Sequence, residues 1–443
     1  TKKGKTFGFV TLELYPTTVG GAGILLHHTI SALLQKEHRV VLYLDLAEDE
    51  ISRFDHRDRH TYPNPDLLSF HDVRGMASAL EFCRSLYDDG EQFRSVSIAH
   101  AILRTQDQHD LDLIEFYDYC GPAFHYLSYP ASQRRPVAIR FHNTVEIIER
   151  GTRSVFHKRR LFTFGMERAQ LALADLVLSP GIRFLNEEIQ KLYASELKRQ
   201  KVMIAPPIHT SIGQVRYNVE SRCVLFYGRL STFKGLDTFI NAAVIALRDP
   251  TFGRWVQSFI IAGPEETVAS ALTLDEMTSV IPADLAGKFQ FIGRLTHKQL
   301  MEVLGDVSFA CFANRMESFC YAAHELHTAG IPLIVADRPA FRDHFTEEDV
   351  VFFDRSASGL AAEMVALAAN PKERVQRSAR ALSLPETNTA DLYLEFAEQA
   401  GKRLSARQQA VCPASTLLTI FVLSDGNPEA EELTAASLAA EGI

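Results

Sequence analysis

The chain of 443 residues is too long for a single hydrophobic core, so its length predicts two or three domains. Hydrophobic residues make up 46% of it, which excludes a disordered protein, and the formal net charge of -9 argues against a general nucleic-acid binder. No apolar run approaches the ~20 residues that cross a bilayer. The 6 cysteines show no metal-binding spacing, so we expect reduced thiols in a cytoplasmic protein.

The N-terminal half begins with a βαβ unit. The pattern predicts an apolar strand over residues 7–12, a glycine-rich turn over 19–23, an amphipathic helix over 24–35 and a second strand over 40–44. Such a turn suits tight packing of a strand against a helix as well as ligand binding. Its G-G-x-G pattern differs from the dinucleotide fingerprint, and Asp45 is the nearest candidate for the acidic residue of that fingerprint, so a nicotinamide enzyme is less favoured.

Two more buried strands are predicted over residues 111–117 and 137–141. The second leads into His142, which is expected at the cleft side of the sheet; a structural histidine is the commoner alternative. Asp110 and Asp112 mimic the D-x-D of metal-dependent transferases. Because they precede a strand, we interpret them as a solvated strand start.

A basic cluster follows the second of these strands. It has no acidic residue between its first and last members and comprises Arg150, Arg153, His157, Lys158, Arg159 and Arg160. It fits either a solvated helix face or an acceptor-side patch for an anionic lipid headgroup or a phosphorylated glycan.

Residues 205–207 (APP) are the predicted linker, and the segment 223–237 after it reads as a buried strand, a turn and a helix. Gly228 ends the strand, and Arg229 and Lys234 follow it. Ligands of open α/β sheets bind beyond the carboxyl ends of strands, where two cations can neutralise a diphosphate without a metal. The alternative is a pair of ordinary surface cations.

The segment 314–332 places two carboxylates around a helix start. Glu317 is expected at the mouth of a cleft, before the turn 318–320, and Glu325 about a turn inside the helix. Free N–H groups at a helix N-terminus suit a phosphate, and carboxylates accept hydrogen bonds from hydroxyls. The pattern therefore fits a ligand with phosphates and hydroxyls, such as a nucleotide sugar, or else a solvated acidic helix start.

Together these two segments resemble the retaining nucleotide-sugar glycosyltransferases of family 4, which have the GT-B fold. The resemblance covers roughly residues 5–410 and is stronger in the C-terminal half. The matching elements are Gly228-Arg229-Leu230, Lys234-Gly235, Phe259–Gly263, Phe291–Gly293, Glu317, Phe319, Glu325, Gly330 and Pro332. Two positions depart from the family pattern: Cys320 stands in place of a glycine and Leu326 in place of an alanine. A side chain at Cys320 is expected to narrow or reshape the phosphate site.

The resemblance implies an α/β fold of two facing Rossmann-like domains with a C-terminal crossover helix. The first domain would cover residues 1–207, joined by the crossover helix 388–410, and the second 208–387. Residues 414–443 resemble the opening strand and helix of a GT-A family 2 transferase. We therefore expect a partial further domain of a longer, multidomain protein, with an ordinary C-terminal helix pair as the alternative.

The resemblance also implies the activity: retaining transfer of a sugar from a nucleotide-diphosphate sugar to a glycan, a lipid-linked or another surface-polysaccharide acceptor. Arg229 and Lys234 would hold the diphosphate, Glu325 the ribose, and Glu317 and His142 the sugar; Glu317, His142, Arg229 and Lys234 are the expected catalytic residues. The expected donor-binding residues are Gly21, Gly23, Gly228, Arg229, Lys234, Gly263, Arg294, Glu317, Phe319, Cys320, Tyr321 and Glu325. The expected acceptor-side residues are Arg150, Arg153, Lys158, Arg159 and Arg160. We expect no cofactor, no metal and no nucleic-acid partner. We do expect contact with an anionic membrane surface.

Three alternatives stay open. A hydrolase or epimerase of the same fold would need its own acid or base, and no pair identifies itself. A phosphorylase would need pyridoxal phosphate, and no Schiff-base lysine can be singled out. A catalytically degenerate module that binds or scaffolds glycan is the third, and Cys320 favours it.

Overall fold

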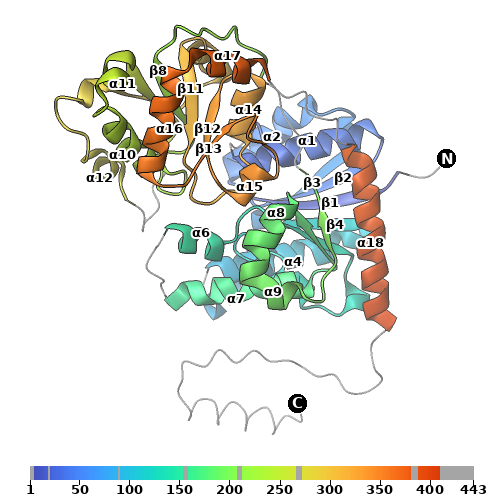
Figure 1. Ribbon diagram of the computed structural model, residues 1–443. Coiled ribbons are helices and arrows are strands. Elements are labelled where there is room, and N and C mark those ends of the chain that lie inside the picture. Colours follow the sequence, from blue (N-terminus) through green and yellow to red (C-terminus); the bar gives the residue numbers. More distant parts are fainter. Residues whose placement is uncertain are drawn as a thin grey trace, which may run out of the picture.

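The computed structural model describes residues 4–17, 20–87, 90–152, 158–206, 212–265, 272–380 and 388–409. These residues form two parallel α/β sheets covered by helices, in two lobes that Figure 1 shows side by side. The expected α/β class with two Rossmann-like units is thereby confirmed. Residues 414–443, predicted as the start of a further domain, lie outside the described residues.

The first sheet comes from the N-terminal half of the chain and contains every strand predicted there. Its described strands are β1 (Thr6–Thr11), β2 (Arg39–Leu44), β3 (Leu68–Asp72), β4 (Leu113–Tyr117), β5 (Val137–Arg140), β6 (Leu176–Ser179) and β7 (Val202–Ile204). Within the described residues they are parallel, in the order β3-β2-β1-β4-β5-β6-β7. The strand order reverses between β1 and β4, which is where such sheets bind ligands, beyond the carboxyl ends of the strands.

Helices cover both faces of this sheet, because successive side chains of a strand point to opposite sides. Phe7 and Phe9 pack with Leu33 on one face, whereas Val10 packs with Ile98 on the other. The described helices of this part of the chain are α1 (Gly21–Gln35), α2 (Glu48–His56), α3 (Val73–Ala77), α4 (Gly90–His109), α5 (Phe124–Leu127), α6 (Val145–Thr152), α7 (Lys158–Leu173), α8 (Ile182–Phe184) and α9 (Gln190–Leu197).

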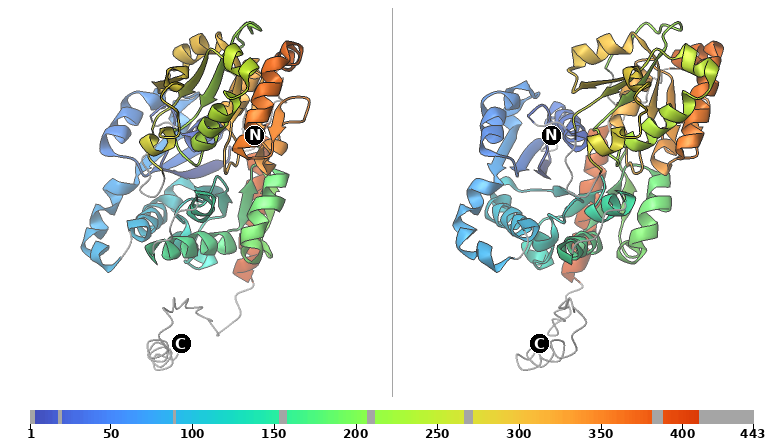
Figure 2. Two further views of the ribbon diagram at one scale, coloured as in Figure 1. Left: turned by 60° about the vertical axis from the view of Figure 1, so that its left-hand side comes forward. Right: turned by 90° about the vertical axis from the view of Figure 1, so that its left-hand side faces the viewer.

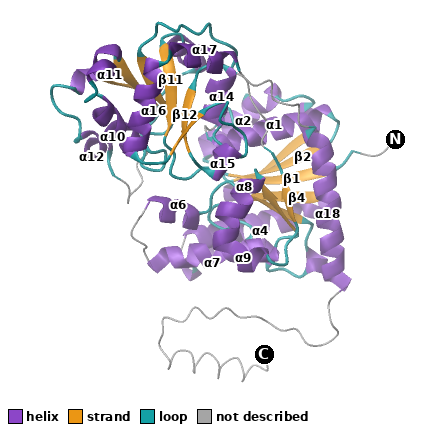
Figure 3. Ribbon diagram, in the orientation of Figure 1, coloured by secondary structure: helices purple, strands orange, loops and turns teal. Residues whose placement is uncertain are grey.

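The second sheet is also parallel. Its described strands are β8 (Cys223–Tyr227), β9 (Ser258–Ala262), β10 (Phe289–Gly293), β11 (Val307–Phe312), β12 (Leu333–Ala336) and β13 (Val351–Phe353), in the order β10-β9-β8-β11-β12-β13. Its described helices are α10 (Leu236–Ala246), α11 (Pro250–Trp255), α12 (Leu274–Thr278), α13 (His297–Leu304), α14 (Tyr321–Thr328), α15 (Pro339–Arg342), α16 (Ala357–Ala369) and α17 (Pro371–Ala379). The two sheets are the orange layers of Figure 3. The predicted linker at 205–207 falls between β7 and β8.

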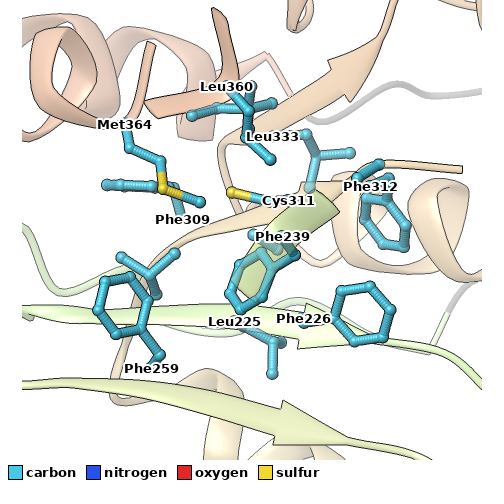
Figure 4. Packing of buried hydrophobic residues seen from close by; sticks show 14 of the residues in the cluster. Leu225, Phe226, Phe239, Phe259, Phe309, Cys311, Phe312, Leu333, Leu360 and Met364 are labelled. Carbon is cyan, nitrogen blue, oxygen red and sulfur yellow. The ribbon is translucent and has the colours of Figure 1, made fainter. Parts of the chain in front are cut away.

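An apolar core fixes the second sheet against its helices. Phe226 of β8 and Phe239 of α10 have ring centroids 5.4 Å apart, and Phe259 of β9 meets the same Phe239 ring edge-on at 6.0 Å. Figure 4 shows these rings with Cys311 and Met364 around them. All five side chains are at least 98% buried, so this core holds the strand ends rigidly in place.

The predicted crossover helix is present as α18 (Thr389–Gln409). It follows the second sheet in sequence but runs along the first domain, as two views show (Figures 1 and 2). Tyr393 and Phe396 are buried in the core that contains Phe7 and Phe9. None of the helices in the described residues is both long and apolar enough to cross a bilayer.

Candidate functional site

Glycines at three neighbouring strand ends form one edge of the second sheet. The Gly228 N–H donates to the Ala262 carbonyl at 3.0 Å, and the Gly263 N–H donates to the Gly293 carbonyl at 2.8 Å. Gly263 has a φ of +148°, and a Cβ there would lie 1.8 Å from the Gly228 carbonyl oxygen. Only glycine fits this approach, so the predicted elements ending in Gly228 and Gly263 come together at this edge.

The loop between β8 and α10 carries the two predicted cations. Arg229 is exposed, whereas the Lys234 side chain is mostly covered, 18% exposed. Gly235 ends the loop with a φ of +76°, and a Cβ there would lie 2.0 Å from the Ala313 carbonyl oxygen. This close approach fixes the loop against the chain that follows β11.

Lys234 and Glu317 form an ion pair between the two segments that the sequence singled out. The Lys234 Nζ lies 2.7 Å from Glu317 Oε2, which also accepts from the Asn314 Nδ2 at 2.7 Å. Glu317 is only 5% exposed, so the expectation that it stands at the mouth of a cleft is wrong. A buried carboxylate needs such partners, and Asn314 was not predicted because its role depends on this burial.

The start of α14 contains the departure from the family pattern. Cys320 has a φ of −93°, a conformation that every residue type adopts, so this backbone does not require glycine. Burial, with the nearby Glu317 carboxylate, raises the pKa of the Cys320 thiol to about 12, so it stays protonated. Beside it, the Phe319 ring stacks on His324 at 4.2 Å and meets Tyr321 edge-on at 4.8 Å.

Glu325, the second predicted carboxylate, lies half-buried in α14. Burial raises the pKa of Tyr227 at the end of β8 to about 12; the Glu325 charge adds to this shift and the Arg294 charge opposes it. Glu325 and Arg294, which directly follows β10 and is exposed, are therefore electrostatic neighbours of Tyr227. The structure thus brings Glu325 and Arg294 to the same end of the second sheet as Gly228.

The glycine-rich turn of the first domain meets the second domain at this place. Gly21 begins α1, and a Cβ there would lie 3.6 Å from Cδ2 of Tyr321. A Cβ at Gly23 would lie 3.2 Å from the backbone of Leu14 and Tyr15, so Gly23 serves tight packing. Gly21, rather than Gly23, faces the other domain.

His142 follows β5 and is half-buried. Burial lowers its pKa to about 3, with a smaller contribution from the Arg140 charge, so its imidazole is neutral at physiological pH. Its backbone N–H donates to Asp118 Oδ1 at 3.1 Å. Asp118 was not among the predicted site residues, although its position directly after a predicted strand places it at the same sheet edge.

Two further contacts join the domains. The Asp343 carboxylate, after α15, accepts from the backbone N–H groups of Arg183 and Phe184 at 2.8 and 2.9 Å, at the start of α8. A Cβ at Gly151 would lie 2.4 Å from Cγ of Met316, the neighbour of Glu317. No sequence signal points to these contacts.

The basic cluster is only partly described. Arg150 donates to Glu146 at 2.8 Å, and Arg160 pairs with Glu149 at 3.0 Å. Arg153 and His157 lie outside the described residues, as do the side chains of Lys158 and Arg159. The two cations that are described pair with carboxylates of α6, which fits a solvated helix face.

The acidic residues considered for other chemistry have local partners. Asp112 accepts from the Thr6 N–H at 2.8 Å at the strand-start edge, as expected for a strand start. Asp45 pairs with Arg74 and Arg94, each at 2.7 Å. The described residues contain no group of three histidine, cysteine, aspartate or glutamate side chains placed to hold a metal ion.

Comparison with known proteins concerns first the second domain. Residues 208–383 match the family model of glycosyl transferases group 1, so the chain carries a domain of this kind. This match covers the second sheet with its glycine-ended strands and the Lys234–Glu317 pair. A search of curated proteins found no sequence match.

Solved structures extend the likeness over both domains. Sucrose-phosphate synthase from Thermosynechococcus elongatus is similar with a TM-score of 0.59 at 14% identity, covering 99% of this chain and 98% of that one. The Anabaena protein HepE, in complex with UDP and glucose, gives 0.57 at 14% identity, covering 97% and 100%. The catalytic domain of starch synthase IV from Arabidopsis thaliana, bound to ADP and acarbose, gives 0.61 at 13% identity, covering 91% and 100%. The chain therefore has the GT-B fold.

Proposed function

We propose that the chain is a retaining glycosyltransferase that moves a sugar from a nucleotide-diphosphate sugar to a glycan, a lipid-linked or another surface-polysaccharide acceptor. The observation that carries the proposal is the 2.7 Å pair of Lys234 with Glu317, which joins the two segments that resemble a donor site. The match of residues 208–383 to glycosyl transferases group 1 supports it, as do neighbours that hold UDP and glucose or ADP and acarbose.

The donor's charged end would lie over the cations of the second domain. Arg229 and Lys234 stabilise the negative charge that grows on the leaving diphosphate, and the first N–H groups of α14 add partial positive charge beside Cys320. Glu325 accepts hydrogen bonds from the ribose hydroxyls. Glu317 takes the sugar hydroxyls through Oε1, which accepts a long hydrogen bond from the Ser318 N–H at 3.3 Å, whereas Oε2 is held by Lys234 and Asn314 at 2.7 Å each.

The reaction would be a front-face displacement. The bond from the anomeric carbon to the diphosphate oxygen breaks, and the acceptor hydroxyl oxygen bonds to that carbon on the same face. A phosphate oxygen of the leaving nucleotide takes the hydroxyl proton, so no protein nucleophile is assigned. Neutral His142 contacts the sugar from the first domain as a hydrogen-bond partner. Domain closure excludes water from the site.

The other proposed site residues shape this cleft. Gly228, Gly263 and Gly21 let the backbone come close to the donor, and Arg294, Phe319 and Tyr321 line it. On the acceptor side, the cluster from Arg150 to Arg160 is proposed to meet an anionic acceptor or membrane surface. We propose a cytoplasmic site of action on this basis, without a metal cofactor.

A degenerate glycan-binding module is the competing function, and Cys320 is the residue that favours it. Its φ of −93° and its buried, protonated thiol show a side chain accommodated without backbone strain. This supports a working site over a damaged one. If Cys320 impairs the site, Cys320→Gly will raise turnover; we expect no gain.

Screening against a panel of nucleotide sugars tests the proposal. A ligand at 100 times its dissociation constant stabilises the fold by ~2.7 kcal/mol, which a thermal-shift assay resolves. The donor so found is then offered with glycan acceptors, and the anomeric configuration of the product is read by NMR. Product with the donor's configuration supports retaining transfer. Inversion rejects the retaining mechanism, and tight donor binding without transfer or hydrolysis supports the module.

A further inference from the structure

Two buried carboxyl groups lie at the edge of the first sheet where β4 and β5 end. Asp118 directly follows β4, Glu167 belongs to α7, and both are 0% exposed. In the described part of the chain, the hydrogen bonds to these carboxylates come from backbone N–H groups rather than from lysine or arginine side chains. Burying a carboxyl without a cation is costly, so this arrangement calls for a reason.

The donors identify which segments the carboxylates hold. Asp118 accepts from the His142 N–H at 3.1 Å. Glu167 accepts from the N–H groups of Val145 at 2.7 Å and Glu146 at 3.2 Å, at the start of α6, and from Cys120 at 2.9 Å. The pair therefore fixes the loop 142–146 after β5 and the loop 118–121 after β4.

The loop after β4 has a backbone that needs such support. Cys120 has a φ of +64°, which costs a residue with a side chain on the order of 1 kcal/mol. Gly121 follows with a φ of +66°, and a Cβ there would lie 2.6 Å from Cβ of Met166, the neighbour of Glu167. The hydrogen bond from Cys120 to Glu167 offsets this strain and ties the loop to α7.

We propose that Asp118 and Glu167 are positioning residues, which hold the loop that carries His142 in the geometry needed for contact with the donor sugar. This inference rests on the proposed function, because the contact of His142 with the sugar is part of it. The ionised carboxylate is the working form of Asp118, since a protonated carboxyl accepts a hydrogen bond from His142 less strongly.

Titration of this pair separates positioning from plain support. Burial raises the pKa of Asp118 to about 7 and raises that of Glu167 as well, with repulsion from Asp118 adding to it. His142 stays neutral in this range. In the described part of the chain, the other charged or titratable groups near the pair include Cys120 after β4, Glu146 of α6 with its partners Arg150 and Arg168, and Tyr193 of α9.

Activity and stability then respond to acid in opposite directions. Between the ordinary carboxyl pKa and about 7, Asp118 is protonated in the folded chain but ionised in the unfolded chain. Its stabilising contribution is therefore present at low pH and is lost as pH rises through about 7. Turnover, in contrast, falls as Asp118 is protonated. A merely structural carboxyl with this raised pKa would change stability in the same way and leave the turnover of the folded chain unchanged.

Selective ¹⁵N-histidine labelling gives a first test that does not depend on activity. The His142 amide resonance, assigned with His142→Gln, is expected to titrate near neutral pH in the natural chain and to shift much less with pH in Asp118→Asn, where Glu167 is the remaining titrating carboxyl. A resonance that does not titrate between pH 5 and 8, or that titrates equally in Asp118→Asn, overturns the proposal. If Asp118→Asn fails to fold, the assigned resonance of the natural chain still tests the proposal, because a resonance that does not titrate overturns it.

Kinetics supply the second test, with nucleotide release from UDP-glucose or from the nucleotide sugar with the largest thermal shift. Asp118→Asn should lower kcat at pH 8 by about 10-fold with little change in KM, as for a misplaced contact group. It should also shift the acid limb of the natural chain, leaving the part that comes from Glu167. Asp175→Asn is the control: a buried carboxylate paired with Arg134 at 2.5 Å, whose loss should cost stability and leave the acid limb. An unchanged acid limb in Asp118→Asn overturns the proposal. If no nucleotide sugar is turned over, the proposed function fails, and so does the positioning role of Asp118 and Glu167 in it. A titrating His142 amide would still establish that the two carboxylates hold the loop.

Discussion

The two domains have the same parallel architecture, but they build their facing edges in different ways. In the second domain, glycines at positions 228, 235 and 263 let backbone segments approach one another closely. Lys234 pairs with Glu317 beside them. The first domain instead buries carboxyl groups, Asp118 among them, which hold its loops through backbone N–H groups. Glycines and cations at strand ends can be recognised in a sequence, whereas carboxylates that bind backbone cannot.

The largest expected effect tests whether the cations of the second domain are special. Lys234→Ala should lower turnover by about 100-fold or more, because it removes positive charge where the leaving group becomes negative. Arg135→Ala in the first domain, where Arg135 pairs with Asp107 at 3.0 Å, is the matched control and should retain turnover. Arg135 precedes β5, so equal losses in steady-state kinetics would show that the loss is not specific to the cation at the strand ends of the second domain. Because Lys234→Ala leaves the buried Glu317 carboxylate without its cation, urea unfolding of this variant checks that the lost turnover does not come from unfolding.

A second comparison concerns backbone approach. Gly235→Ala should lower the free energy of unfolding by about 3 kcal/mol, since the new Cβ meets a carbonyl oxygen at a positive φ. Gly293 has a φ of +68°, but a Cβ there would meet open space. Gly293→Ala should therefore lower the free energy of unfolding by about 1 kcal/mol. Urea unfolding measures both. Similar values for the two variants would show that φ alone, not the approach to Ala313, sets the requirement for glycine.

A smaller effect is expected where the domains touch. Asp343→Ala removes the acceptor for two N–H groups at the start of α8, a loss of about 1 kcal/mol, as for a helix N-cap. It should shift the chain toward separated domains, seen as a larger radius of gyration in X-ray scattering. Asp337→Ala, which breaks an ion pair with Arg342 inside the second domain, should not. No shift in Asp343→Ala would mean that other contacts hold the domains.

The smallest effect expected is that of chelation. With Arg229 and Lys234 at the diphosphate, EDTA should leave turnover nearly unchanged, because side-chain cations would do what Mg²⁺ does in metal-dependent transferases. Loss of activity in EDTA, restored by Mg²⁺ or Mn²⁺, would show that the second domain's cations are insufficient.

Much of the fold could be predicted because its determinants are local. The strands predicted at residues 7–12, 40–44 and 224–227 are apolar runs buried on both faces, and each is a strand of the structure. Gly228, which follows β8, was singled out by the turn in which it stands, whereas Gly263, which follows β9, was singled out by the family resemblance. The crossover helix followed from its own periodicity and from the family resemblance.

The site was harder to predict because its partners are distant in sequence. Lys234 and Glu317 are 83 positions apart, and each was recognised without the ion pair that buries Glu317. Asn314, Asp118 and Asp343 were missed because what they bind is set by tertiary structure. The φ of Cys320 could not be read from the sequence, and at −93° it shows that this backbone does not require glycine. The effect of the Cys320 side chain on the phosphate site stays a prediction.

Because of the crossover helix, the order in which the two domains are synthesised differs from the order in which their folding can be completed. Tyr393 of this helix packs in the core with Phe7 and Phe9, and its hydroxyl donates to Glu115 of the Glu115–Arg140 ion pair at 2.7 Å. These contacts cannot form before Tyr393 has been synthesised. Between Ile204 and Thr389 the ribosome must add roughly 180 residues, which at ~5–20 residues per second takes about 10–40 s. The elements of the second domain, continuous from Cys223 to Ala379, are all made within that interval. The half of the chain that is synthesised first is therefore the half that finishes folding last, with an apolar face open to chaperones until α18 arrives.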